Sequence, residues 1–292
     1  MELIYGYMSN DDLRHKLNDL TKKTFGFDFE NWFKEGYFEN EYIPYSFMEN
    51  NKIISNVSAN QMYFMQDGVK KKYIQIGTVM TDELYRNKGL AKKLMEYVIK
   101  QYKDAFDGIY LFSNLSAIDF YKKIGFVEGM QYQYSLKSKL YVKENLTDLF
   151  FSIDENDNHM KQKYKDSIRQ SKVNSRMEQI NKFSLQMFYT YNMEEVYYAK
   201  GIDCFVVMKM EGDTLILKNI ICKEKVSLRA IINRINKKYN NLILGFTPCI
   251  EDEDMFNLEK FNGDYDYRFL YLGRKLESIE NDKLYFPQLS HA

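Results

Sequence analysis

Apolar positions cluster into three neighbouring segments of the chain, each bounded by polar residues. The segments run from Ile43 to Met48, from Ile53 to Phe64 and from Val69 to Thr81, and their β-branched and aromatic content favours strands. Asn50-Asn51 and Asp67-Gly68 separate them, and both pairs suit the tight type I′ turn of a hairpin. The pattern therefore predicts an antiparallel meander.

Helical spacing surrounds this meander. Four apolar residues behind it recur at every fourth position on one helix face: Leu90, Leu94, Val98 and Tyr102. A short strand, Ile109 to Phe112, follows this helix. Ahead of the meander, the spacing predicts one helix capped by Ser9 and a second, aromatic-rich helix within Phe25 to Phe38. Val127 to Leu136 is expected to supply the last strand of the sheet. Together these elements predict an α/β (α+β mixed-sheet) fold in which helices cover the faces of the sheet.

The C-terminal part of the chain repeats the order strand, strand, strand, helix, strand. These predicted elements are Val196 to Lys200, Cys204 to Met210, Thr214 to Ile221, Leu228 to Ile235 and Leu242 to Phe246. The highly charged segment Asp154 to Ser171 is expected to be helical and to connect the halves. We therefore divide the chain into a first domain, residues 1–140, and a second unit, residues 141–292, which contains this connection and a smaller α/β domain.

Composition narrows the class of protein without identifying it. Lys and Arg total 41, and Asp and Glu total 41, so the net charge is zero and neither a nucleic acid nor a membrane is an expected partner. Cys204, Cys222 and Cys249 lack metal-ligand spacing, and we expect reduced core cysteines in a cytoplasmic protein without a metal. No apolar run would span a membrane, and the first residues do not resemble a signal peptide. The abundance of Tyr, Lys, Asn and Ile indicates a biased genome, which we expect to be bacterial, and the oligomeric state, a homo-oligomer included, stays open.

A glycine turn between the third strand and the long helix is the first candidate for chemistry. The turn reads Arg86-Asn87-Lys88-Gly89-Leu90-Ala91, and the first N–H groups of the helix behind it have no intrahelical partner. The helix macrodipole adds positive potential there, so a pyrophosphate would fit. A side chain at Gly89 would keep the phosphates away from the backbone. A glycine near a helix start more often serves only as a turn residue between two elements, so this motif needs support from another part of the sequence.

The support comes from the segment behind the next strand. It contains five residues at fixed spacing, namely Asn114, Ala117, Tyr121, Gly125 and Phe126. Together with the glycine turn, this segment resembles the GNAT family of acetyltransferases, whose motifs read R/Q-x-x-G-x-G/A and N-x-x-A-x-x-x-Y-x-x-x-G-F. Ala91 replaces the commoner glycine, and Glu83 stands where a proline is usual. The resemblance covers roughly residues 1–140.

The resemblance implies a GNAT fold for residues 1–140, with acetyl-CoA as co-substrate and direct transfer of acetyl to an amine. The strand residues Val79, Met80 and Thr81 would then splay from the neighbouring strand and pair with the pantetheine arm. An N–H at Val79 or Met80 would bind the thioester oxygen. The residues implied at the pyrophosphate are Arg86, Asn87, Lys88, Gly89, Leu90 and Ala91, and those beside the pantetheine or the next helix start are Asn114 and Ala117. For Arg86, added charge and simple packing remain equal alternatives.

Tyr121 is the candidate general acid. In the matched motif its phenol would donate a proton to the thiolate that leaves when the tetrahedral intermediate collapses. The alternative is that Tyr121 only packs beside Phe120.

The general base is not on the strand where many acetyltransferases carry a glutamate, because Tyr73 to Thr81 contains no Glu, Asp or His. The chain instead ends in an apolar tail. The residues expected to anchor this tail against the first domain are Phe286, Pro287 and Leu289. They would bring His291 and the carboxylate of Ala292 close to Tyr121, as in the enhanced-intracellular-survival acetyltransferases that the first domain resembles. A tail that only stabilises the second domain is the alternative.

The second unit lacks both motifs. Cys222-Lys223-Glu224-Lys225-Val226 contains no glycine, and nothing behind Phe246 matches the second motif. We expect a degenerate GNAT-like repeat that binds no coenzyme A, with a sterol-carrier-like domain as the alternative.

Two functions stay open at this point. The first is an N-acetyltransferase acting on a primary amine of a small molecule or peptide, and the second is a catalytically weak acetyl-CoA-binding sensor or scaffold. The motifs do not specify the acceptor. Four acidic residues near the expected pocket mouth would suit a polyamine or an aminoglycoside, although such a cluster is more often a solvated face: Glu30, Glu35, Glu39 and Glu41.

Overall fold

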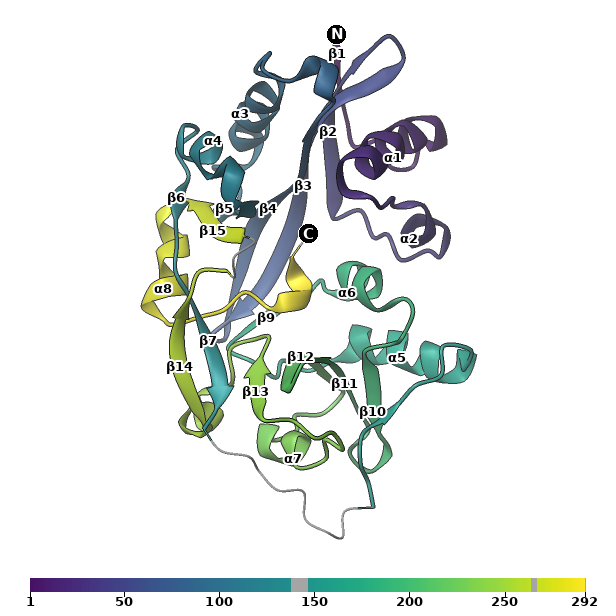
Figure 1. Cartoon of the computed structure of the whole chain (residues 1–292), viewed down its shortest axis with the longest axis vertical. Helices are drawn as coiled ribbons and strands as arrows, with labels where there is room; N and C mark the ends of the chain where they lie inside the picture. The colour runs from purple at the N-terminus through teal and green to yellow at the C-terminus, as the bar shows by residue number, and fades with distance from the viewer. Residues whose placement is uncertain (138–146, 264–266, 292) are drawn as a thin grey trace.

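The computed structural model describes residues 1–137, 147–263 and 267–291, which form two mixed sheets along the long axis of an elongated molecule (Figure 1). The first sheet has the strand order β1-β2-β3-β4-β5-β15-β6, and β9 pairs with β3 outside this path. These strands are β1 (Glu2–Tyr5), β2 (Tyr42–Glu49), β3 (Lys52–Gln66), β4 (Val69–Thr81), β5 (Gly108–Asn114), β6 (Val127–Glu128), β9 (Met177–Gln179) and β15 (Tyr267–Leu272). The predicted meander β2-β3-β4 is confirmed, and both of its turns have two residues with positive φ, as type I′ turns require.

Helices cover both faces of the first sheet, because each has one apolar stripe to bury. They are α1 (Asp11–Phe25), α2 (Glu30–Lys34), α3 (Leu90–Tyr102) and α4 (Ile118–Lys122). Figure 1 shows α1 and α2 on one side of the sheet and α3 and α4 on the other. Leu17 and Leu20 of α1 enter one core, and Leu94 and Val98 of α3 enter another. Asn10 caps α1 through its side chain, so the expectation of a Ser9 cap is wrong.

The second sheet has the strand order β14-β7-β13-β12-β11-β10-β8. Its strands are β7 (Gln131–Leu136), β8 (Phe151–Ser152), β10 (Val196–Ala199), β11 (Cys204–Glu211), β12 (Thr214–Cys222), β13 (Asn241–Leu244) and β14 (Phe256–Phe261). The remaining helices are α5 (Asn158–Gln170), α6 (Phe183–Thr190), α7 (Leu228–Ile232) and α8 (Ser278–Asn281). The parallel pair β12–β13 flanks α7 just as the parallel pair β4–β5 flanks α3, which confirms the mixed α/β fold class and the repeated order of elements.

The two sheets exchange strands. β6 stays in the first sheet while β7, directly behind it in the chain, lies between β13 and β14 of the second sheet. β14 stays in the second sheet while β15 lies between β5 and β6 of the first sheet. The expectation that Val127 to Leu136 closes the first sheet is therefore right only for β6. The division at residue 140 stays a prediction, but strands from both sides of it complete each sheet.

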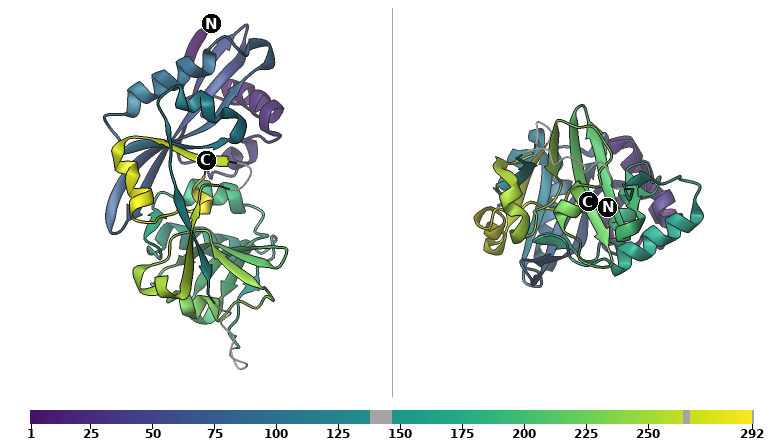
Figure 2. Two further views of the ribbon diagram at one scale, coloured as in Figure 1. Left: turned by 60° about the vertical axis from the view of Figure 1, so that its left-hand side comes forward. Right: turned by 90° about the horizontal axis from the view of Figure 1, so that it is seen from below.

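Two further features bind the halves together. Arg176 forms ion pairs with Asp67, at the tip of the β3–β4 hairpin, and with Glu253 of the second half, at 2.8 and 2.6 Å. Phe286, near the C-terminus, is fully buried and stacks on Tyr110 of β5 with ring centroids 4.2 Å apart. Figure 2 shows the last described part of the tail, in yellow, between the two halves of the molecule.

The expectation of reduced cysteines is wrong for two of the three. Cys204 and Cys222 lie opposite each other on β11 and β12 and form a disulfide in the core of the second half, whereas Cys249 is free. Cross-strand pairing brought together two residues that are 18 positions apart in the sequence. Within the described ranges, no helix combines the length and the apolar character that crossing a bilayer requires.

Candidate active site

The first sheet opens between β4 and β5. The parallel pairing runs from Tyr73 with Gly108 to Gln75 with Tyr110 and stops there, although β4 continues to Thr81. The later backbone groups of β4 on this side therefore have no β5 partner. An extended ligand can add to such an edge as a further strand.

A bulge at Thr78 turns the β4 backbone at the opening. The register between β3 and β4 shifts there, and Thr78 has a φ of 40°, which is unusual for a β-branched residue. Buried polar groups hold this conformation: Asn56 Nδ2 donates to the Thr78 carbonyl at 2.9 Å, and Thr78 Oγ1 lies 2.8 Å from both the Tyr42 hydroxyl and Ser58 Oγ. No sequence signal identified Thr78. Backbone strain held by a complete network is a frequent feature of functional sites.

The glycine turn forms the start of α3 as expected. Asn87 and Gly89 have φ values of 63° and 73°, and Gly89 is the residue that precedes the first turn of the helix. A Cβ built on Gly89 meets no atom within 4 Å, so the backbone faces open space. Arg86 lies 3.7 Å from Glu83, and Lys88 covers the ring of Tyr85. The helix N-terminus is thus accessible to an anion.

Tyr121 of α4 faces the same space. Its ring packs edge-on against Phe120 and Phe126. Tyr121 therefore does make the packing contact with Phe120 that was the alternative to an acid role. Its hydroxyl has no hydrogen-bond partner among the described residues, and burial raises the pKa of Tyr121 to about 12. Asn114 accepts from the Ala117 N–H at 3.1 Å, which is the helix-start contact expected for it.

The C-terminal tail reaches this space from the other half. The His291 ring stacks on Phe112 of β5 with centroids 3.7 Å apart, and the Tyr189 hydroxyl donates to the His291 carbonyl. His291 Nε2 is buried and has no partner within the described ranges, and burial lowers the pKa of His291 to about 3. Ala292, whose carboxylate we expected beside Tyr121, lies outside the described residues.

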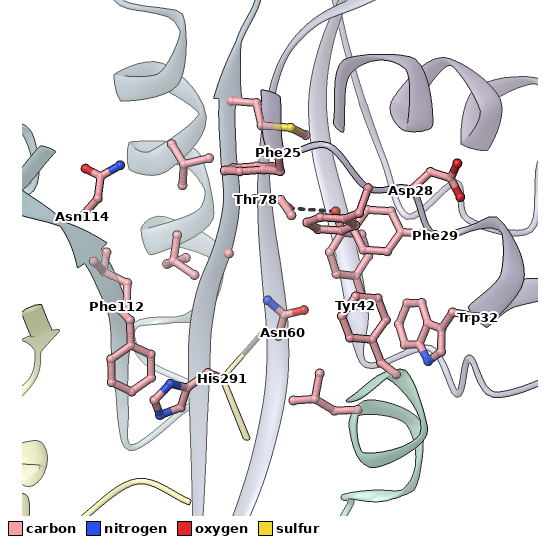
Figure 3. A pocket seen from close by; sticks show the side chains of 18 of the residues that line it. Phe25, Asp28, Phe29, Trp32, Tyr42, Asn60, Thr78, Phe112, Asn114 and His291 are labelled. Carbon is pink, nitrogen blue, oxygen red and sulfur yellow. Dashed lines mark hydrogen bonds between the residues drawn. The ribbon is translucent and has the colours of Figure 1, made fainter. Parts of the chain in front are cut away.

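One cavity of about 1100 Å³ joins these features. Figure 3 shows Phe112 and His291 on one wall and Phe25, Phe29, Tyr42 and Trp32 on the opposite wall. The expected site residues that line it are Val79, Met80, Thr81, Arg86, Ala91, Asn114, Ala117, Tyr121 and His291. Asn87, Lys88, Gly89 and Leu90 do not line it, although their neighbours Arg86 and Ala91 do.

Helix α6 supplies wall residues that the sequence did not indicate. Leu185, Met187, Phe188 and Tyr189 line the cavity, although α6 belongs to the second half. Nothing in the sequence relates this helix to the first sheet, because the contact depends on how the halves pack.

The four acidic residues expected near the pocket entrance do not form a single negatively charged surface. Glu30 accepts from Arg14 at 3.1 Å, which lowers the pKa of Glu30 to about 2, and Glu39 pairs with Arg169. Glu41 does not line the cavity, and burial raises its pKa to about 7. Only Glu35 of the four lines the cavity. The described residues contain no cluster of side chains suited to a metal ion.

The second sheet has a comparable opening that the chain itself fills. β12 continues beyond its last partner on β13, and Gln288 of the tail donates its N–H to the Gly245 carbonyl at 2.8 Å. A Cβ at Gly245 would lie 2.9 Å from Gln288 Oε1 and 3.0 Å from Lys218 Cα. The 3₁₀ turn Gln288–Ser290 thus closes the carboxyl end of β13, and no glycine turn precedes the short helix α7.

Residues 10–126 match the model of the acetyltransferase (GNAT) family, so this part of the chain is a GNAT acetyltransferase domain. The protein is accordingly an N-acetyltransferase. No curated protein matches the sequence.

Several solved structures resemble the chain over most of its length. One is a conserved Enterococcus faecalis protein described as a probable N-acyltransferase (TM-score 0.58, 14% identity, 95% of this chain and 73% of that one). A second is a GNAT protein from Kribbella flavida (TM-score 0.55, 13% identity, 92% of this chain and 70% of that one). A third is Eis1 from Mycobacterium abscessus (TM-score 0.55, 10% identity, 92% of this chain and 72% of that one). At these identities the likeness shows a shared fold, and it extends over both halves.

Proposed function

We propose that the protein transfers an acetyl group from acetyl-CoA directly to a primary amine of a small molecule or peptide. The observation that carries this proposal is the single cavity that extends from the open edge of β4 to Tyr121 and His291. The pantetheine arm would pair with β4, and a backbone N–H of Val79 or Met80 would donate to the thioester oxygen. The N–H groups from Asn87 to Ala91 would bind the pyrophosphate at the start of α3.

The amine nitrogen attacks the thioester carbonyl carbon, and the carbon–sulfur bond breaks as the intermediate collapses. Tyr121 donates its proton to the leaving thiolate. Burial raises the pKa of Tyr121 to about 12, so the phenol stays protonated throughout the neutral range and can donate a hydrogen bond to the leaving sulfur.

His291 or the carboxylate of Ala292 would accept the proton of the attacking ammonium. Burial keeps the His291 imidazole neutral, because its pKa is about 3. The neutral imidazole can accept a proton, and the carboxylate of Ala292 is the alternative acceptor, directly or through water.

The second half, in this proposal, holds no coenzyme A, because its own tail fills the corresponding opening. A cytoplasmic location and a bacterial source also stay proposals.

The test is amine-dependent release of coenzyme A thiol from acetyl-CoA. We expect Tyr121→Phe to lower turnover by about one to three orders of magnitude while acetyl-CoA binding, followed by calorimetry, is unchanged. Tyr239→Phe is the matched control, since Tyr239 is a buried tyrosine of the second half outside the cavity. Full turnover in Tyr121→Phe would remove this residue from the mechanism. Acetyl-CoA binding without thiol release for any amine would instead favour a sensor or scaffold.

A further inference from the structure

Exposed aromatic rings gather around the cavity. Phe25, Phe27, Tyr189 and Tyr191 all line it, although they are 48, 39, 41 and 58% exposed. Large apolar side chains exposed together in one place usually mark a binding surface. Phe25 ends α1 and Phe27 follows it, whereas Tyr189 belongs to α6 and Tyr191 follows that helix, so both halves of the chain contribute.

The rings around the cavity pack against one another at the distances of aromatic pairs. Phe188 of α6 packs edge-on against Phe27 and Trp32, with centroids 5.9 and 5.8 Å away, and Phe25 stacks on Phe27 at 6.0 Å. Rings at these distances prefer offset or edge-on neighbours, and an aromatic ligand can provide one for the exposed faces.

The charges of the cavity do not suit a polycation. Asp28 and Glu35 are the carboxylates among the described residues that line it. Asp28 Oδ1 already accepts from the Glu30 N–H at 3.1 Å, and Lys22 lies 4.0 Å from Asp28. A ligand with several ammonium groups would lose hydration at each of them without enough carboxylates to replace it.

We propose that the acceptor is an arylalkylamine, a flat aromatic group with one primary amine on a short alkyl chain; this rests on the proposed function. The aromatic group lies among Phe27, Phe188 and Tyr189. The amine lies toward His291, which lines the same cavity. The amine nitrogen bonds to the acetyl carbon as the carbon–sulfur bond breaks. The products are the N-acetylated arylalkylamine and coenzyme A thiol. The ammonium nitrogen loses two protons in all: one restores the Tyr121 hydroxyl after it has protonated the thiolate, and the other leaves to solvent.

Trp32 makes a direct binding test available, because it is the single tryptophan of the chain and lines the cavity. We expect 2-phenylethylamine to change Trp32 fluorescence saturably in the full-length protein, and spermidine to have no such effect. In the thiol-release assay, 2-phenylethylamine should have a kcat/KM about three- to tenfold above that of spermidine, on the scale of one aromatic contact.

Phe27→Ala should weaken 2-phenylethylamine binding about three- to tenfold. Phe151→Ala is the matched control, because Phe151 is a comparably exposed aromatic residue (50%) outside the cavity. This variant should bind 2-phenylethylamine as tightly as the wild type does. Preferred acetylation of spermidine, or an unchanged affinity of Phe27→Ala for 2-phenylethylamine, would overturn the proposal of an aromatic acceptor. Neither result would contradict the proposed acetyltransferase function. Binding of 2-phenylethylamine without thiol release from any amine would overturn the proposed function and the acceptor role with it.

Discussion

Gly89 combines a left-handed backbone with open space where a side chain would project. We expect Gly89→Val to abolish acetyl-CoA binding, because the new side chain would occupy the space through which the phosphates approach the start of α3. Calorimetric titration of the folded variant measures this.

Gly212→Val is the matched control for Gly89→Val. Gly212 also has a positive φ, and a Cβ there also meets no atom within 4 Å, but it lies in the turn between β11 and β12. Both variants carry a backbone strain of about 1–2 kcal/mol, so only Gly89→Val should lose the coenzyme. Undiminished affinity in Gly89→Val would place the phosphates elsewhere.

Glu41 makes stability depend on pH. Its Oε2 is buried without a partner among the described residues, and burial raises its pKa from 4.5 to about 7. The folded state therefore holds this proton more tightly than the unfolded chain, so the free energy of unfolding falls as pH rises from 4.5 to about 7.

We expect Glu41→Gln to raise the free energy of unfolding by about 1–3 kcal/mol at pH 8 and to change it little at pH 4. The glutamine has the size of the protonated acid but cannot ionise. Glu155→Gln, at an exposed position, should show no such pH dependence in parallel denaturant titrations. An equal effect of Glu41→Gln at both pH values would contradict the raised pKa.

At the scale of elements, the tail has two parts with different contacts. The turn Gln288–Ser290 is held by Gly245 and by the core, since Leu289 and Ser290 are buried, whereas His291 lines the cavity. Removal of His291 and Ala292 alone therefore leaves the anchoring turn in place.

We expect this two-residue deletion to keep acetyl-CoA binding and to lower turnover at neutral pH by about two to four orders of magnitude. Turnover should partly recover at high pH, because an alkylamine with a pKa of about 10.4 then loses its proton without a base. His291→Phe keeps a ring against Phe112 and separates packing from proton transfer in the same pH–rate measurement. A deletion variant as active as the full chain at neutral pH would exclude the tail from catalysis.

At the scale of the whole molecule, neither half contains all of its own sheet. Without the second half, β5 would lose β15, and Phe64, Tyr73 and Tyr110 would lose Phe286. Loss of a buried phenylalanine alone costs about 3–5 kcal/mol, which is a large part of the stability of a typical domain.

We therefore expect a fragment of residues 1–140 to show no cooperative thermal transition, although this range contains both acetyltransferase motifs. Circular dichroism during heating, with the full chain as reference, measures this. A fragment that melts cooperatively and binds acetyl-CoA would show that the exchanged strand and the tail are not needed for folding.

The sequence by itself determined many of the local elements and the two acetyltransferase motifs. Apolar segments rich in β-branched and aromatic residues, with turn residues between them, gave β2, β3 and β4 nearly at their observed bounds, because strand preference and turn residues are local properties. The motif residues between Arg86 and Phe126 likewise carried the resemblance to the acetyltransferase family, since they lie close together in the chain.

Only the tertiary structure decided the rest. The exchange of β7 and β15, the Cys204–Cys222 disulfide and the wall formed by α6 all depend on contacts between residues far apart in the sequence. A strand has the same alternating pattern whichever sheet it joins, and a cysteine has the same neighbours in the sequence whether paired or free. The choice is made by the energy of burying both halves together, which no local pattern contains.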